Sequence, residues 1–132
     1  MMHRAAEFLR KCGTFYLATC EGDQPRVRPF GAVDEFEGRL YLVTGNQKPV
    51  FKQMQACPRV EICAMDSEMK WIRISARAVA DPRKEAREHM LESNPGLKRM
   101  YSAEDGIMEV LYLKDASVTL SSFTAAPEQW SF

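Results

Sequence analysis

The spacing of apolar residues along the chain predicts three helices. Apolar positions recur at helical intervals at the N-terminus, in the order Met2, Ala5, Ala6, Leu9 and Cys12. Gly13 follows this segment and is expected to end the first helix. A second helix is predicted from Pro49, which suits a first helical position, to just before Pro58. A third is predicted to open at Asp81-Pro82, with the aspartate as N-cap, and to run to about Ser93.

Alternation of apolar and polar residues, typical of half-buried strands, predicts about seven strands. They are expected at residues 14–20, 26–36, 39–44, 59–65, 69–80, 108–114 and 116–123. The last two are expected to form a closing hairpin that turns near Asp115, with an irregular tail after it. Strands joined by short turns favour a largely antiparallel sheet, closed or nearly closed into a barrel. The prediction is therefore a mostly β protein, an antiparallel split β-barrel of six to seven strands with three flanking helices.

Length and charge narrow the class of protein further. The 132 residues are expected to form one domain, residues 1–132, with a single core. Lysine plus arginine equals aspartate plus glutamate at 18 each, so the basic surplus of a nucleic-acid binder is missing and no nucleic-acid partner is expected. No apolar run approaches the ~20 residues of a membrane span, and Arg4 and Glu7 interrupt the N-terminal apolar residues. We therefore expect a cytoplasmic protein without a membrane partner.

The four cysteines give no sign of a metal site. Cys12, Cys20, Cys57 and Cys63 form no CxxC pair and no zinc spacing with histidine. We therefore expect no bound metal, and we expect the cysteines to be buried free thiols of a reducing cytosol.

Basic residues cluster in two neighbouring segments. Arg26 and Arg28 share one face of a predicted strand, and Lys48 and Lys52 are four apart at the predicted start of the second helix. A helix start carries unpaired N–H groups and the positive end of the helix dipole, so this combination suits a phosphate. The alternative is that the arginines pair with nearby acids on a solvated strand and that the lysines form an ordinary polar helix face.

One stretch, residues 26–58, contains Arg26-Val27-Arg28-Pro29-Phe30-Gly31 followed by Leu42-Val43-Thr44-Gly45-Asn46. This stretch resembles the flavin mononucleotide (FMN) site of pyridoxamine 5'-phosphate oxidase-like split-barrel proteins. Residues 70–76 resemble the family's central strand. Residues 81–90 followed by 97–101 resemble its helical insertion, and 109–113 with 121–123 resemble its C-terminal hairpin. True pyridoxamine phosphate oxidases carry an arginine- and tryptophan-rich C-terminal segment, whereas residues 115–132 contain no arginine or lysine. The resemblance is therefore closer to the smaller nitroimidazole-resistance-type (Nim-like) branch.

This resemblance implies a homodimer with FMN at the subunit interface. By analogy, Arg26, Arg28, Pro29 and Phe30 would line the flavin and its phosphate. The other implied cofactor contacts are Val43 and Thr44 at the edge of the ring, Lys48 and Lys52 at the phosphate, Trp71, and Trp130 over the partner's site. By residue type alone, Trp71 and Trp130 are more often core or interface aromatics than cofactor contacts.

The implied activity is that of an oxidoreductase. Electrons would pass from a transiently bound nicotinamide donor, NAD(P)H, through FMN to a small-molecule substrate, in a ping-pong mechanism. The catalytic residues are unknown, because the only histidines, His3 and His89, match no family motif. Alternatives are a non-catalytic FMN carrier or redox sensor, a plain dimeric interaction module, and a split barrel that binds deazaflavin or haem. Haem would need an axial ligand from one of the two histidines.

Overall fold

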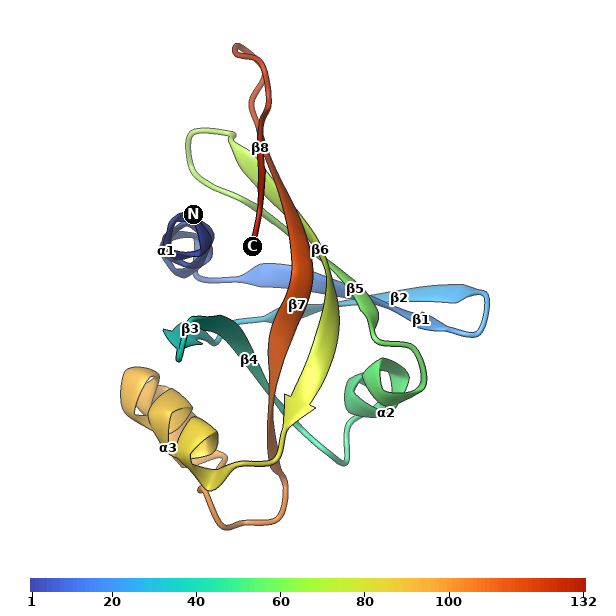
Figure 1. The fold of residues 1–132 in the computed structure, drawn as a ribbon, viewed down its shortest axis with the longest axis vertical. Helices are drawn as coiled ribbons and strands as arrows, with labels where there is room; N and C mark the ends of the chain where they lie inside the picture. The colour runs from blue at the N-terminus through green and yellow to red at the C-terminus, as the bar shows by residue number, and fades with distance from the viewer.

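One eight-stranded antiparallel sheet, flanked by three α-helices, makes up the computed structural model, which describes residues 1–132 (Figure 1). The helices are α1 (Met2–Cys12), α2 (Pro49–Ala56) and α3 (Lys84–Ser93), followed by the 3-10 helix η1 (Pro95–Arg99). The strands are β1 (Phe15–Glu21), β2 (Gln24–Phe30), β3 (Val33–Phe36), β4 (Arg39–Gly45), β5 (Arg59–Met65), β6 (Trp71–Asp81), β7 (Met108–Ser121) and β8 (Glu128–Ser131).

The strand order explains why the barrel is split. It runs β2-β1-β5-β6-β7-β4-β3, with β8 added to β7, so the sheet begins at β2 and ends at β3. These two edge strands are consecutive in the sequence, and the short connection Gly31-Ala32 is all that joins them. The sheet therefore curls back on itself without closing. We call the gap between β2 and β3 the seam. The predicted fold class, an antiparallel split barrel with three helices, is confirmed, with eight strands in place of six or seven.

The predicted single strand at 26–36 is wrong, because the seam divides it. β2 pairs with β1 and β3 pairs with β4, at opposite ends of the sheet. Phe30 packs against Phe15 with ring centroids 6.1 Å apart, while Val33 is only 2% exposed in the core. The half-buried Phe30 and the buried Val33 thus pack at different edges, and the small residues between them let the chain cross from one edge to the other.

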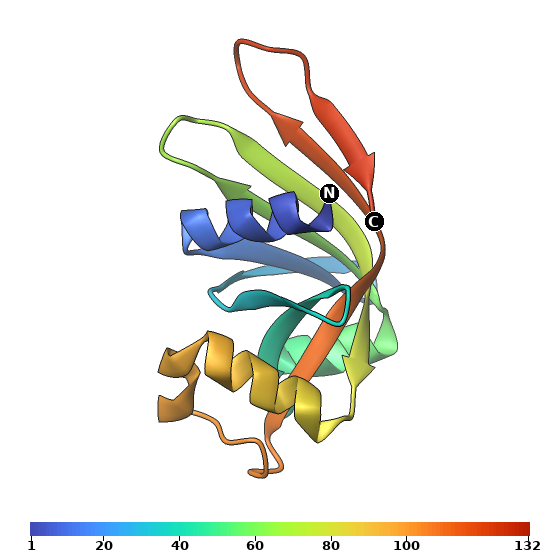
Figure 2. The same ribbon diagram turned by 60° about the vertical axis from the view of Figure 1, so that its left-hand side comes forward.

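The predicted C-terminal hairpin is also wrong, because β7 is one strand of 14 residues that pairs with β6 on both sides of Asp115. Ser75 lies opposite Ser117 and Arg77 opposite Lys114, so β7 holds one residue more than β6 over this interval. Asp115, at φ 53°, lies in this bulge, which bends the strand but does not reverse it. The tail is not irregular, because β8 pairs with residues 117–120 and forms a projecting hairpin with β7 (Figure 2).

Two apolar clusters attach the helices to the sheet. The larger one buries Leu9 of α1 and Phe51 of α2 against strand residues such as Ile62 and Ile74. The smaller one packs Met90 of α3 against β4 and β7. Helices α1 and α3 lie on one side of the long β6–β7 pair and α2 on the other (Figure 1). None of the helices is long and apolar enough to span a membrane.

The N- and C-termini lie side by side (Figure 2). The indole N–H of Trp130 donates to the carbonyl of Met1 at 3.1 Å, and Arg4 lies 4.9 Å above the Trp130 ring. Gly13 ends α1 at φ 78°, as expected.

Asp81 does not cap the third helix, contrary to the sequence prediction. The helix begins at Lys84, and Asp81 is the last residue of β6 and only 5% exposed. Its carboxylate accepts hydrogen bonds from the Tyr41 hydroxyl at 2.7 Å and from the Arg83 guanidinium at 3.0 Å. The carboxylate thus links Arg83, just before α3, to Tyr41 of β4 instead of capping the helix.

The prediction of buried thiols is wrong as well, although all four cysteines are free. Cys20 is exposed at the end of β1, and the other three are only half-buried. In the strands, alternation places Cys20 and Cys63 on the less buried face, whereas Cys12 ends α1 and Cys57 follows α2.

Candidate functional site

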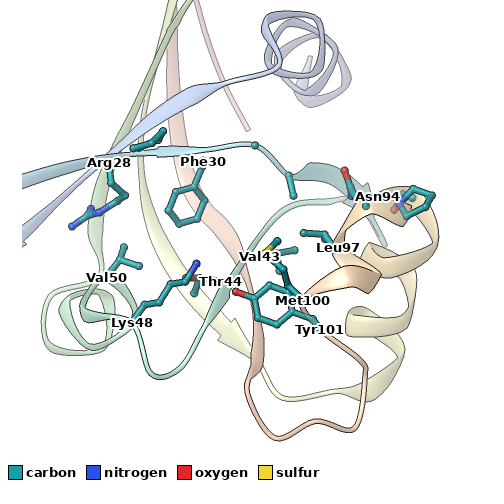
Figure 3. A pocket seen from close by; sticks show the side chains of 16 residues that line it. Arg28, Phe30, Val43, Thr44, Lys48, Val50, Asn94, Leu97, Met100 and Tyr101 are labelled. Atoms are coloured by element: carbon teal, nitrogen blue, oxygen red, sulfur yellow. The ribbon is translucent and has the colours of Figure 1, made fainter.

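A cavity of about 610 Å³ opens beside the seam (Figure 3). It is lined by the end of β2 and the crossing (28–32), by β4 (43 and 44), by the start of α2 (48 and 50), and by the segment around η1 (93–97, 100 and 101). This volume lies within the range of small-molecule and cofactor sites. The fold therefore brings some of the predicted basic and apolar site residues together with a wall that the sequence did not indicate.

Arg28 is held at one end of the cavity by neutral acceptors. Its guanidinium donates to the Leu17 carbonyl at 3.0 Å, to the Thr19 hydroxyl at 2.8 Å and to the Gln53 amide oxygen at 2.6 Å. Burial, and then the nearby charge of Arg26, lower the pKa of Arg28, although a guanidinium keeps its proton at neutral pH. No carboxylate lies within ion-pair distance of Arg28, so its positive charge is not neutralised within the chain.

Lys48 adds a second positive charge to the cavity lining, with its side chain extending toward the middle of the cavity (Figure 3). It is the N-cap of α2, it is exposed, and it forms no ion pair. The first turn of α2 contains no acidic residue that would offset the positive end of the helix dipole. An anion at this position would therefore meet two side-chain cations and a helix start.

A second cavity, of about 540 Å³, adjoins the first and shares Arg28, Lys48 and Val50 with it. Its lining also contains Arg26 and Glu21, which form a half-exposed ion pair at 2.9 Å. Hydrogen bonds from Arg26 lower the pKa of Glu21. Three cations and one carboxylate give this basic end a net charge of +2, because the Arg26–Glu21 pair cancels.

The other end of the cavity is mainly apolar. Val43, Leu97, Met100 and Tyr101 gather there, on the side away from Arg28 (Figure 3). Val43 is 7% exposed and Tyr101 9% exposed, whereas Met100 is 65% exposed, so this wall combines packed side chains with an open apolar one. The lining contains no histidine, cysteine or carboxylate. The cavity thus suits an elongated ligand with one anionic end and one apolar end.

Six of the ten predicted cofactor residues line this cavity: Arg28, Pro29, Phe30, Val43, Thr44 and Lys48. Arg26 lines only the adjoining cavity. Lys52 lies in a third hollow of about 240 Å³ together with Cys20, and this hollow adjoins the second cavity but not the first. The separation of the two lysines has a physical cause: Lys48 has extended backbone angles, so the rule that residues four apart share a helix face does not apply to this pair.

The two predicted tryptophans lie away from the cavity of this chain. Trp71 packs on Phe123 with centroids 5.0 Å apart, near the projecting hairpins. Trp130 lies beside Met1 and Arg4 at the joined termini. Contacts of these residues with a cofactor in a partner's site remain predictions.

The histidines are also outside the cavity. His3 lies 2.8 Å from Glu35 and 3.1 Å from Glu7, and the hydrogen bond to Glu35 is the main cause that raises its pKa. His89 stacks on Phe36 at 4.7 Å and lies 3.2 Å from Asp34. Both side chains therefore connect helices to β3 and do not face the cavity.

Sequence reasoning missed Gln53, Thr19 and the whole η1 wall. Gln53 is 7% exposed and shares the buried side of α2 with Val50 and Met54, which are three residues before it and one residue after it. A polar residue within an otherwise apolar helix face was a signal that could have been found. The η1 wall gave no such signal, because its contribution depends on how α3 packs on β4 and β7.

An antiparallel sheet that curls without closing, with a cofactor-sized cavity beside its seam, defines a split-barrel protein. The sequence profile of the pyridoxamine 5'-phosphate oxidase family matches residues 1–132. A crystal structure of a NimC/NimA family protein from Clostridium acetobutylicum is 53% identical, with a TM-score of 0.98 over 99% of this chain and 92% of that one. The chain therefore belongs to the pyridoxamine 5'-phosphate oxidase family, in its NimC/NimA-like branch.

More distant structures share the fold. General stress protein 26 from Bacillus anthracis is 18% identical, with a TM-score of 0.76 and full coverage of both chains. An FAD-binding protein from Mesorhizobium loti is 16% identical, with a TM-score of 0.65 over 92% of this chain and 96% of that one. No curated protein sequence matches the chain.

Proposed function

We propose that the chain binds FMN and acts as an oxidoreductase that passes electrons from a nicotinamide donor, through FMN, to a small-molecule acceptor. The observation that carries this proposal is the polarity of the cavity beside the seam. Arg28 lies at one end, Lys48 extends into the middle of the cavity, neither charge is neutralised, and the other end is a mainly apolar wall. Membership of a family with an FAD-binding structural neighbour supports a flavin as the ligand.

The charge of the basic end fits the phosphate of FMN. A phosphate monoester carries about −1.5 to −2 charges at neutral pH. Arg26, Arg28, Lys48 and Glu21 together contribute a net charge of +2. Arg28 is already fixed by three hydrogen bonds, so little side-chain entropy is lost when it meets an anion.

Each group of lining residues has a separate task in this proposal. Arg28 and Lys48 hold the phosphate, and Phe30 and Val43 pack against the flat ring system. Thr44 offers a hydroxyl at the ring edge, and Tyr101 covers the apolar end and excludes water. When bound, FMN supplies the hydride chemistry itself, so the protein needs only to bind, orient and tune it.

A second copy of the chain is proposed to complete the site. Tyr16, Val27 and Met65 are 51%, 67% and 49% exposed, and the strand register places them on the same outer face of the sheet. Apolar side chains gathered on one exposed face are typical of a protein–protein interface. We therefore propose a homodimer through this face with FMN at the interface, which light scattering coupled to size-exclusion chromatography tests directly.

A non-catalytic FMN carrier or redox sensor is the second candidate. The observation that favours it is the lining itself, in which Tyr101 is the only group besides the two cations that can exchange a proton. Reduction by a donor without turnover of any acceptor is the behaviour expected of a carrier.

Absorbance spectroscopy tests the proposal. The purified protein is mixed with FMN, freed of excess ligand and scanned from ~300 to ~700 nm, then treated with NADH or NADPH without oxygen. Retained bands near ~370 and ~450 nm that bleach with a donor and return with an acceptor support the oxidoreductase. Retained bands that bleach with a donor but do not return with any acceptor, or that do not bleach at all, favour the carrier or sensor. A Soret band after incubation with haem, or a failure to retain flavin, contradicts FMN as the ligand.

A further inference from the structure

We propose that Gln53 is a positioning residue for the anion site: it holds Arg28 toward the cavity while leaving the charge of that arginine free for a phosphate monoester. This inference rests on the proposed function, because it concerns how the same site selects its ligand. The residue is not one of those expected to touch the cofactor, and it acts through Arg28.

The amide of Gln53 lies between one arginine and one carboxylate. Its oxygen accepts from the Arg28 guanidinium at 2.6 Å and from the Thr19 hydroxyl at 2.6 Å. Its nitrogen donates to the Glu21 carboxylate at 3.4 Å. Gln53 and Thr19 are 7% and 2% exposed, so these groups cannot easily turn to water for other partners.

This arrangement separates two charges that would otherwise pair. Glu21 is engaged by Arg26 through two hydrogen bonds, at 2.9 and 3.1 Å, and by the Gln53 nitrogen. Arg28 accordingly has only neutral acceptors, which orient the guanidinium without cancelling its charge. A carboxylate at position 53 would form a charge-assisted pair with Arg28 and compete directly with an incoming phosphate.

The amide therefore gives the site two properties at once. It satisfies the hydrogen bonds of a half-buried arginine, which a purely apolar residue would leave unmet. It also keeps the net charge of the basic end at +2, which a glutamate would lower to +1. The ligand class that gains most from this arrangement carries a terminal phosphate monoester.

The test compares two isosteric charge changes on the same helix. Gln53→Glu places a carboxylate against Arg28, and Gln55→Glu adds the same charge at an exposed position of α2 that does not line the anion site. Dissociation constants for FMN and for riboflavin, which lacks the phosphate, are measured by quenching of flavin fluorescence. We expect Gln53→Glu to weaken FMN binding by about 10-fold or more and to change riboflavin binding by less than about 2-fold. Gln55→Glu should leave both constants close to those of the parent.

The ratio of the two constants separates a role in anion binding from a role in folding. An equal loss for both ligands, or no loss of FMN affinity in Gln53→Glu, overturns the inference. A parent protein that binds riboflavin as tightly as FMN overturns the phosphate assignment in the proposed function itself. If Gln53→Glu does not fold, Thr19→Val removes one neutral acceptor of Arg28 without adding charge. That variant should lose FMN affinity selectively, and an unchanged FMN-to-riboflavin ratio would count against the role of these acceptors.

Discussion

Replacing Asp81 by asparagine should destabilise the fold at neutral pH but not at low pH. The carboxylate lies at the end of β6, where it receives hydrogen bonds from Arg83 and from the Tyr41 hydroxyl. Asparagine retains one oxygen, but its NH₂ group would face these donors. Arg83 also pairs with Glu37 at 2.9 Å, so the cluster joins the start of α3 to the β3–β4 turn.

The expected loss in the free energy of unfolding follows from the ionisation of Asp81. The hydrogen bonds from Arg83 are the main cause that lowers its pKa from 3.8 to about 2, against the opposing effect of burial. Each pKa unit corresponds to about 1.4 kcal/mol, so the ionised carboxylate contributes about 2 kcal/mol to the free energy of unfolding. Because the pKa is lowered in the folded state, this contribution is present above about pH 4. It is lost as the pH falls through about 2.

Chemical denaturation at several pH values measures this difference. The free energy of unfolding is determined for the parent and for Asp81→Asn between about pH 7 and pH 2.5. We expect the variant to be less stable by about 2 kcal/mol at pH 7, with the gap narrowing below pH 4. Glu68→Gln, at an exposed turn, is the matched control and should show no such gap. A gap that stays constant across this pH range would show that the loss reflects packing and not the charge of Asp81.

Three further predictions concern the site and the fold. Lys48→Glu should weaken FMN binding by about 2 kcal/mol, measured by flavin fluorescence, whereas Lys52→Glu should have a smaller effect because it lies outside the cavity. Equal losses would contradict this placement. Gly13→Ala should lower the free energy of unfolding by about 1 kcal/mol, because φ is 78° at this helix end. Ile74→Ala, at a fully buried position, should cost about 3 kcal/mol in the same denaturation assay, and a loss below about 1 kcal/mol would contradict its place in the core.

Local patterns were sufficient to predict most of the elements and the fold class. The helix at Met2–Cys12 and its end at Gly13 follow from apolar spacing and from the backbone freedom of glycine. The alternation in 71–80 correctly placed Ile72 and Ile74 in the core and Arg73 on the other face. These features depend on residues close together in the sequence, which is why sequence reasoning reaches them.

The errors occurred where distant strands decide the outcome. Residues 26–36 alternate as one strand would, and nothing within them shows that β2 and β3 have partners at opposite edges. The bulge at Asp115 resembles a turn locally, and only pairing with β6 on both sides makes it a continuous strand. The same holds for the site, since the basic residues were visible in the sequence but Thr19 and Tyr101 depend on tertiary packing.

A ligand bound in the proposed site would also connect the two ends of the sheet across the seam. The cavity is lined by the end of β2 and by β4, and β4 is the hydrogen-bonded partner of β3. A ligand that contacts both β2 and β4 connects the two ends of a sheet whose edge strands, β2 and β3, are not paired with each other. By mass action, any opening of the sheet at Gly31-Ala32 must then be accompanied by loss of the ligand. Bound ligand should therefore slow the exchange of backbone amide hydrogens in the β1–β2 and β3–β4 hairpins together and by the same factor.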